Sequence, residues 1–163
     1  MTKRHLIILS HDHHHGLVLA WRLRQGERAL LTDGWTHDRK EKAKRVQEFY
    51  RESLKLHFKA EEEALFPMIA EHIPTSSTLV KDLVNQHRMI EGLVSTIAQA
   101  DGDSLNQALI ELGTLLEHHI RSEERELFPL FEREMPAPLK ARVDSDVERV
   151  HTRVDVSGTN GAV

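Results

Sequence analysis

The chain of 163 residues contains no cysteine. It therefore cannot form disulfide bonds, thiolate zinc sites or cysteine-ligated iron–sulfur clusters, and it has no cysteine nucleophile. Proline and glycine are also scarce, with 5 and 8 residues, and they lie mainly between segments of helical periodicity. No segment keeps up the alternation of apolar and polar residues that a half-buried strand needs. These absences favour an all-α fold.

Long apolar runs and basic tracts are missing as well. The longest apolar runs cover residues 6–9 and 17–21, far short of the roughly twenty residues that a membrane span needs. Because 22 Lys and Arg stand against 26 Asp and Glu, the formal net charge is −4, which disfavours nucleic acid as a partner. We therefore expect a cytoplasmic protein that binds neither a membrane nor nucleic acid. Its oligomeric state stays open.

The periodic segments predict four long helices, at about 10–31, 38–72, 77–100 and 104–134, with Ser10 as the first N-cap. A shorter fifth helix is expected from the apolar spacing of Leu139, Val143, Val147 and Val150. Short connections between long helices are typical of an antiparallel up-down-up-down four-helix bundle. We expect one bundle domain over residues 1–151, with the short C-terminal helix included, and a flexible tail over 152–163.

Histidine, by contrast, is abundant, with twelve residues, and two of them begin a repeated motif. HFKAEEEALFP from His57 and HIRSEERELFP from His119 share the pattern HxxxEExxLFP. Residues four apart project from one face of a helix, so His57 with Glu61, and His119 with Glu123, can each bind an ion. An ionised carboxylate inside a bundle costs several kcal/mol without a counter-charge, which a metal ion would supply. The repeat therefore predicts a metal site.

Two further helices offer partner histidines. His87 begins an apolar stripe on the third helix, which turns it towards the core. On the first helix both His13 and His14 begin such stripes; we favour His13 as the ligand, with His14 as the alternative or as a hydrogen-bonding neighbour. The four histidines would lie at similar depths along an up-down-up-down bundle, and so in one layer.

This order of residues, with LFP after each His–x3–Glu pair, resembles the hemerythrin-like HHE cation-binding family over roughly residues 10–135. The resemblance implies a four-helix bundle that holds a non-haem di-iron centre. Four histidines would cap the two irons and two glutamates would bridge them. The ligands would be His13 (or His14), His57, Glu61, His87, His119 and Glu123.

The chain departs from the oxygen-carrying hemerythrins at two positions. Glu91 stands where those proteins have a second histidine one turn after His87, and it could supply a further carboxylate. Glu123 follows its histidine by four residues, whereas the oxygen carriers have an aspartate at five. Both features match the wider bacterial HHE group. Imidazole and carboxylate ligands favour iron as the cofactor, with manganese or zinc less favoured.

The function expected from this resemblance is to bind or sense a small ligand such as dioxygen, nitric oxide or peroxide. The alternative is an iron-handling or redox enzyme that turns over peroxide or nitric oxide, or repairs iron centres. Because no general acid–base group or nucleophile stands out, we assign no catalytic residue and favour the non-enzymatic function. Glu62 and Glu124 are expected to be solvated or to support the ligands, and His151 receives no role.

Overall fold

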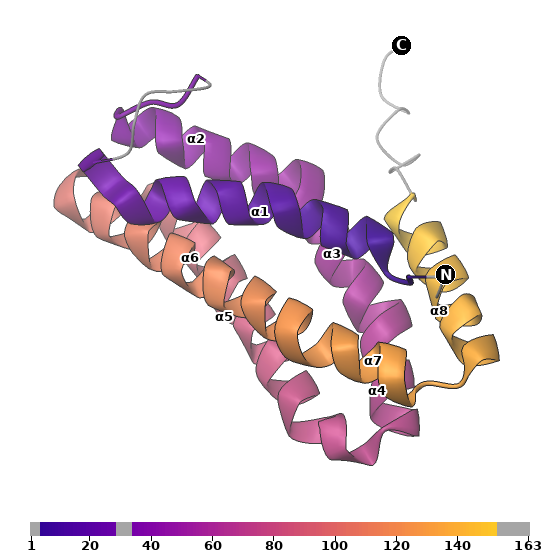
Figure 1. The fold of residues 1–163 in the computed structure, drawn as a ribbon. Helices are drawn as coiled ribbons and strands as arrows, with labels where there is room; N and C mark the ends of the chain where they lie inside the picture. Colours follow the sequence, from indigo (N-terminus) through magenta and orange to yellow (C-terminus); the bar gives the residue numbers. More distant parts are fainter. Residues whose placement is uncertain (1–3, 29–33, 153–163) are drawn as a thin grey trace, which may run out of the picture.

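The computed structural model describes residues 4–28 and 34–152, and no strand occurs in these two ranges (Figure 1). Four long helical stretches and a fifth helix form a helical bundle. The second stretch contains two short π-helical segments, η2 (Tyr50–Leu54) and η3 (Glu61–Leu65), and the fourth contains one, η5 (Glu123–Leu127). The helix is not broken at any of them. The elements are α1 (Ile7–Gln25), η1 (Gly26–Arg28), α2 (Arg39–Phe49), η2 (Tyr50–Leu54), α3 (Lys55–Ala60), η3 (Glu61–Leu65), α4 (Phe66–His72), η4 (Pro74–Ser76), α5 (Ser77–Gln99), α6 (Gly102–Ser122), η5 (Glu123–Leu127), α7 (Phe128–Glu134) and α8 (Ala137–His151).

The first helix begins earlier than predicted, and Ser10 is not its N-cap. Leu6 takes that place with a left-handed φ of 59°. Its backbone N–H donates to Asp144 Oδ1 at 2.8 Å, and the N–H of His5 donates to Glu132 Oε1 at 2.8 Å. These partners lie on α8 and α7, so contacts distant in sequence fix the start of α1.

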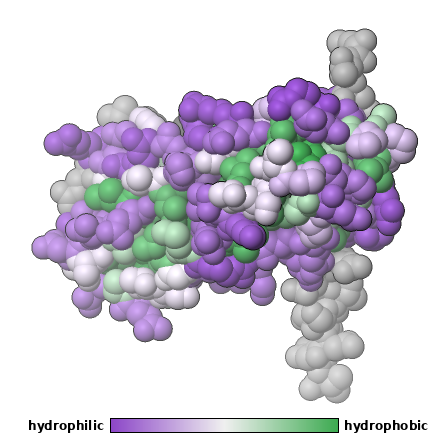
Figure 2. All heavy atoms as spheres, turned by 90° about the horizontal axis from the view of Figure 1, so that it is seen from below, coloured by the Kyte–Doolittle hydropathy of each residue, from purple (hydrophilic) through white to green (hydrophobic). Residues whose placement is uncertain are grey.

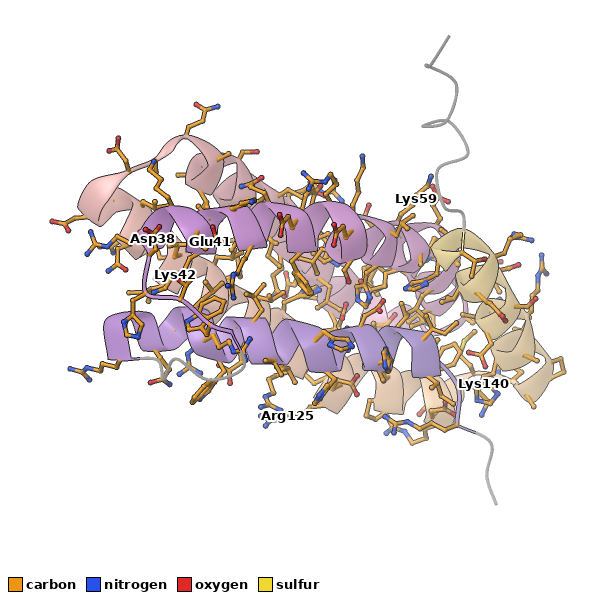
Figure 3. All side chains as sticks on the ribbon, turned by 90° about the horizontal axis from the view of Figure 1, so that it is seen from above. Asp38, Glu41, Lys42, Lys59, Arg125 and Lys140 are labelled. Carbon is orange, nitrogen blue, oxygen red and sulfur yellow. The ribbon has the colours of Figure 1, made fainter. Side chains whose placement is uncertain are left out.

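The end of α1 is set by Gly26, whose φ of 56° leaves the α-helical region. The predicted extension towards residue 31 lies partly outside the described residues. The second stretch starts as predicted, because Asp38 Oδ1 accepts the backbone N–H of Glu41 at 2.8 Å (Figure 3). Lys42 is buried between α2 and the end of α1, where its ammonium donates to the Gly26 carbonyl at 3.2 Å (Figure 3).

The predicted fifth helix is confirmed as α8, which lies across the end of the bundle beside the start of α1 (Figure 1). Its apolar side buries Val143, Val147 and Val150. It packs against α3 and η3. The predicted tail lies outside the described residues, apart from Thr152.

Two apolar clusters form the core, one towards each end of the bundle. The first includes Leu9, Leu65, Leu83 and Leu127 together with the valines of α8. The second includes Ala20, Phe58, Ile90, Leu116 and Ile120. Along every long helical stretch the candidate ligands lie where one cluster gives way to the other, so a polar layer forms at the boundary of the clusters.

The outer surface is mostly hydrophilic in the view from below, with hydrophobic residues in smaller patches (Figure 2). Among the large apolar side chains, Ile7, Trp21 and Met89 are at least half exposed, at 61%, 50% and 58%. None of the helices described has an apolar stretch that could cross a membrane.

At Gly113 the backbones of α1 and α6 approach each other closely. A Cβ atom added there would lie 2.8 Å from the Ala20 carbonyl oxygen and 2.9 Å from Leu23 Cβ. We expect Gly113→Ala to cost about 1–3 kcal/mol through overpacking, which outweighs the gain of about 1 kcal/mol in helix propensity. Urea unfolding followed by circular dichroism would measure this loss.

Gly92 of α5 is the matched control, since an added Cβ atom would meet nothing within 4 Å. Gly92→Ala should raise the free energy of unfolding by about 0.5–1 kcal/mol. Equal stabilisation by both substitutions would contradict the close approach of α1 and α6.

Candidate metal centre

The two copies of the repeated motif have the same local structure. In each copy the histidine lies in the last turn of an α-helix, and the glutamate four residues later begins a π-helical segment, η3 at Glu61 and η5 at Glu123. The prolines of the motif, Pro67 and Pro129, follow these segments and cannot donate a backbone hydrogen bond. The helices continue beyond both prolines, and a π segment precedes each of them.

Six side chains from the four long stretches meet in the polar layer between the two core clusters. Each is almost completely buried, with an exposed fraction of 3% or less: His13, His57, Glu61, His87, His119 and Glu123. Burial of two carboxylates and four imidazoles in one layer is unusual and requires compensating interactions.

The ligand atoms form two groups of four that share both glutamates. One group consists of His13, His57, Glu61 and Glu123, and the other of His87, His119 and the same two glutamates. Within each group the atoms lie within 4.8 Å of one another.

Each glutamate turns one oxygen to each group. Glu61 Oε1 lies 2.8 Å from His57 Nε2, and its Oε2 lies 3.1 Å from His87 Nε2. Glu123 Oε2 lies 2.9 Å from His13 Nε2, and its Oε1 lies 3.3 Å from His119 Nε2. Both carboxylates thus occupy bridging positions between the groups.

Outer side chains fix the orientation of all four imidazoles. In every case Nδ1 faces an oxygen that can only accept a hydrogen bond, so Nδ1 carries the proton and Nε2 turns its lone pair inwards. The pairs are His13–Glu124 at 2.7 Å, His87–Glu62 at 2.7 Å, His57–Asp12 at 2.9 Å and His119–Gln86 at 2.9 Å.

The atoms that face the centre are therefore all electron-pair donors. The Nε2 atoms of His13 and His57 lie 3.1 Å apart, as do those of His87 and His119. None of the four oxygens of Glu61 and Glu123 has a hydrogen-bond partner. Buried acceptors that face only one another are costly. Cations placed among them would satisfy every atom at once, so this donor set fits two metal ions that share two carboxylates.

Protons can also supply positive charge among these acceptor atoms. Burial lowers the pKa of the His13 imidazole, but the carboxylates of Glu123, Glu124 and Glu61 outweigh it and raise the pKa to about 12. His57 behaves similarly, because Glu61 and Asp12 overcome its burial and raise its pKa to about 9. Burial and the charge of Glu61 raise the pKa of Glu123 to about 7. Metal binding must displace these protons.

The structure brings His13 into the layer and leaves His14 outside. His14 is exposed, and its ring faces the exposed ring of His15 at a centroid distance of 5.7 Å. Glu91 also lies outside, since it pairs with the Arg88 guanidinium at 3.1 Å. Glu62 and Glu124 hold ligand rings, which agrees with the supporting role considered for them.

Sequence reasoning missed Asp12, Gln86 and His151. Asp12 and Gln86 directly precede His13 and His87, the ligand histidines of the first and third long helices, and this shared position was the available signal. His151 Nε2 donates to Asp12 Oδ2 at 2.7 Å. Burial alone would raise the pKa of the Asp12 carboxyl. Hydrogen bonds from His57 and His151 outweigh burial and hold this pKa below its usual value.

Aromatic rings shield the centre from solvent. Phe58 stacks on His87 with ring centroids 3.8 Å apart, and Phe128 stacks on His13 at 5.3 Å. Beside the His57 and His119 rings remains a cavity of about 10 Å³, enough for one water-sized molecule. Asp12 and His13 also line it, and its apolar walls come from Gly16, Leu54, Phe58, Leu116 and Ile120.

A family model described as "Hemerythrin HHE cation binding domain" matches residues 4–131. No curated protein and no solved structure matches the chain.

Metal loading should release protons. Because the pKa values of His13 and His57 are raised to about 12 and about 9 in the metal-free protein, both are protonated at pH 7.5. We expect about two protons to leave on loading, and the affinity to fall about tenfold per displaced proton for each unit that the pH drops. A pH indicator in weakly buffered solution would count the protons during anaerobic Fe²⁺ titration.

His14→Ala provides the control, since this exposed side chain lies outside the layer. It should leave the proton count unchanged. An affinity that is the same at pH 6 and pH 8 would contradict the protonated metal-free state.

Substitution of single ligands should separate the centre from its surroundings. His13→Ala removes one of four donors of one group and should weaken that position by more than the about 10–100-fold that loss of an outer partner costs. Glu61→Ala removes a donor from both groups and should lower the metal content further. Elemental analysis after gel filtration would measure bound metal per chain.

Neighbouring residues supply the matched controls for these substitutions. His14→Ala and Glu63→Ala alter exposed side chains next to the ligands and should keep the full metal content. If His14→Ala and His13→Ala lost metal equally, the assignment of the first-helix ligand would be wrong.

Proposed function

The chain belongs to the hemerythrin HHE cation-binding family, and from this we propose that it is a non-haem di-iron protein that binds or senses a small ligand such as dioxygen, nitric oxide or peroxide. The observation that carries the proposal is the pair of buried ligand groups that share Glu61 and Glu123. One carboxylate alone could serve a single ion, but two carboxylates with an oxygen turned to each group suit two ions.

Iron is the ion that we propose. Each group offers two imidazole nitrogens and two carboxylate oxygens, a set that suits iron, with manganese and zinc as alternatives. An ion that prefers five or six ligands would keep positions free beyond these four donors. Bound iron would supply redox chemistry and a place for a small ligand.

The surroundings of the centre support a small, uncharged ligand. The cavity beside His57 and His119 has mostly apolar walls and a volume of about 10 Å³. Gly16 leaves room there for the end of the Ile120 side chain, whose Cδ1 atom would lie 2.7 Å from a Cβ atom at this position. The outer carboxylates hold the imidazoles in place, and the stacked phenylalanines limit access of water.

We also propose that the four long stretches run up-down-up-down in an antiparallel bundle. The second and third stretches, and the third and fourth, are joined by short connections, α1 packs against α6, and α5 packs against α6. This arrangement accounts for the common layer, because alternating directions bring the middle of each stretch to one depth.

The test is anaerobic loading with Fe²⁺, followed by metal analysis and optical spectra. We expect two irons per chain, one for each ligand group. Nitric oxide, dioxygen or peroxide should then change the spectrum at the iron, and removal of a bound gas should reverse the change. A chain that stays free of iron would contradict the proposal, and catalytic consumption of peroxide or nitric oxide would favour the enzymatic alternative.

Gly16→Ala tests whether the cavity is the route of the ligand. The new methyl group should push Ile120 into the cavity and slow the association of nitric oxide severalfold in stopped flow, while the iron content stays unchanged. Gly92→Ala, in open space, should change neither quantity. Unchanged association in Gly16→Ala would exclude this route.

A further inference from the structure

The two halves of the centre follow one plan but differ in their outer partners. The half with His13 and His57 is held by two carboxylates, Glu124 and Asp12. The half with His87 and His119 is held by one carboxylate, Glu62, and by the neutral amide of Gln86. Asp12 and Gln86 hold corresponding positions, since each precedes a ligand histidine and binds the ring of the following motif. The halves therefore differ in charge at this position.

The second difference comes from α8. His151, the last residue of this helix, donates from Nε2 to Asp12 Oδ2 at 2.7 Å. The same oxygen accepts the Nδ1–H of His57 at 2.9 Å. Two donors on one oxygen restrict the Asp12 side chain, which is only 16% exposed. No second donor to Gln86 is found in the two described ranges of the chain.

The packing of α8 gives His151 a fixed place. Val143, Val147 and Val150 are buried in the first core cluster. The helix packs on α3 and η3, the segments that carry His57 and Glu61. Asp12 comes from α1. The contact therefore joins three parts of the chain that lie far apart in sequence.

We infer that His151 is a positioning residue of the metal centre, which holds Asp12 against His57 and makes the His13–His57 position the one that releases its cation more slowly. A carboxylate partner on Nδ1 strengthens an imidazole as a ligand more than a neutral amide does, and a restrained partner fixes the orientation of the ring. The inference rests on the proposed dinuclear centre.

Release of iron to a chelator tests this role without any measurement of activity. Protein loaded with Fe²⁺ under anaerobic conditions is mixed with an excess of a coloured ferrous chelator. The wild type should release its iron in two phases of equal amplitude. His151→Ala should accelerate the slow phase about tenfold, at the lower end of what loss of an outer partner costs, and leave the fast phase unchanged.

Conservative substitutions make the test specific. His151→Gln retains an N–H donor that can reach Asp12 and should restore most of the slow phase. Asp12→Asn replaces the carboxylate by an amide, as in Gln86, and should bring the two phases together. Because these two variants report on the same contact, the test still decides if His151→Ala fails to fold. Arg149→Ala, an exposed neighbour on α8 that pairs with Asp146 at 2.9 Å, should leave both phases unchanged.

The outcomes distinguish the two proposals. If the wild type binds two irons but His151→Ala and Asp12→Asn release them as the wild type does, the positioning role is overturned and the dinuclear centre stands. Acceleration of both phases by His151→Ala, without rescue by His151→Gln and with a matching loss of stability in the metal-free protein, would mean that His151 merely anchors α8. A wild type that binds fewer than two irons would overturn the proposed function itself.

Discussion

Two buried carboxylates, Glu61 and Glu123, impose the constraint on which the rest of the centre depends. Both are fully buried and none of their oxygens has a hydrogen-bond partner. Such charges cost several kcal/mol unless positive charge lies beside them. Neutral imidazole rings cannot supply this positive charge, because their Nδ1 protons are directed outwards to other acceptors. The layer thus has a strong deficit of positive charge, and either protons or cations must fill it. This competition links the charge state, the pH and the metal content of the protein.

The position of this layer between two apolar clusters explains how the chain maintains it. Each cluster packs on its own side, with Leu9, Leu65 and Leu127 in one and Phe58, Leu116 and Ile120 in the other. Helix packing on both sides fixes the backbone of every ligand, so the donors converge in one layer. A cation that binds only this folded arrangement must also stabilise it. The metal would therefore act as a cross-link between four helical stretches, at the level where apolar contacts are interrupted.

Local sequence patterns were sufficient for the helices and for the motif. The doubled HxxxEExxLFP pattern predicted that His57, Glu61, His119 and Glu123 act together, because residues four apart share a helix face. The choice between His13 and His14 stayed open, since both begin apolar stripes, and only packing shows that the side with Val18 and Trp21 is exposed. The start of α1 and the role of His151 depend on contacts between residues more than one hundred positions apart. No window of sequence contains both partners of such a contact.

The asymmetry of the centre and the position of the cavity concern the same half. The cavity is lined by Asp12, His13 and His57, together with His119 from the other half. A ligand that enters it thus meets the cation position whose two rings are held by carboxylates. Stronger imidazole donors stabilise a higher positive charge on the ion. A ligand that draws electron density from the ion needs this stabilisation. The repeat supplies two equivalent ligand pairs, but Asp12 and His151 distinguish the half beside the cavity, which is the half that the proposed small ligand would meet.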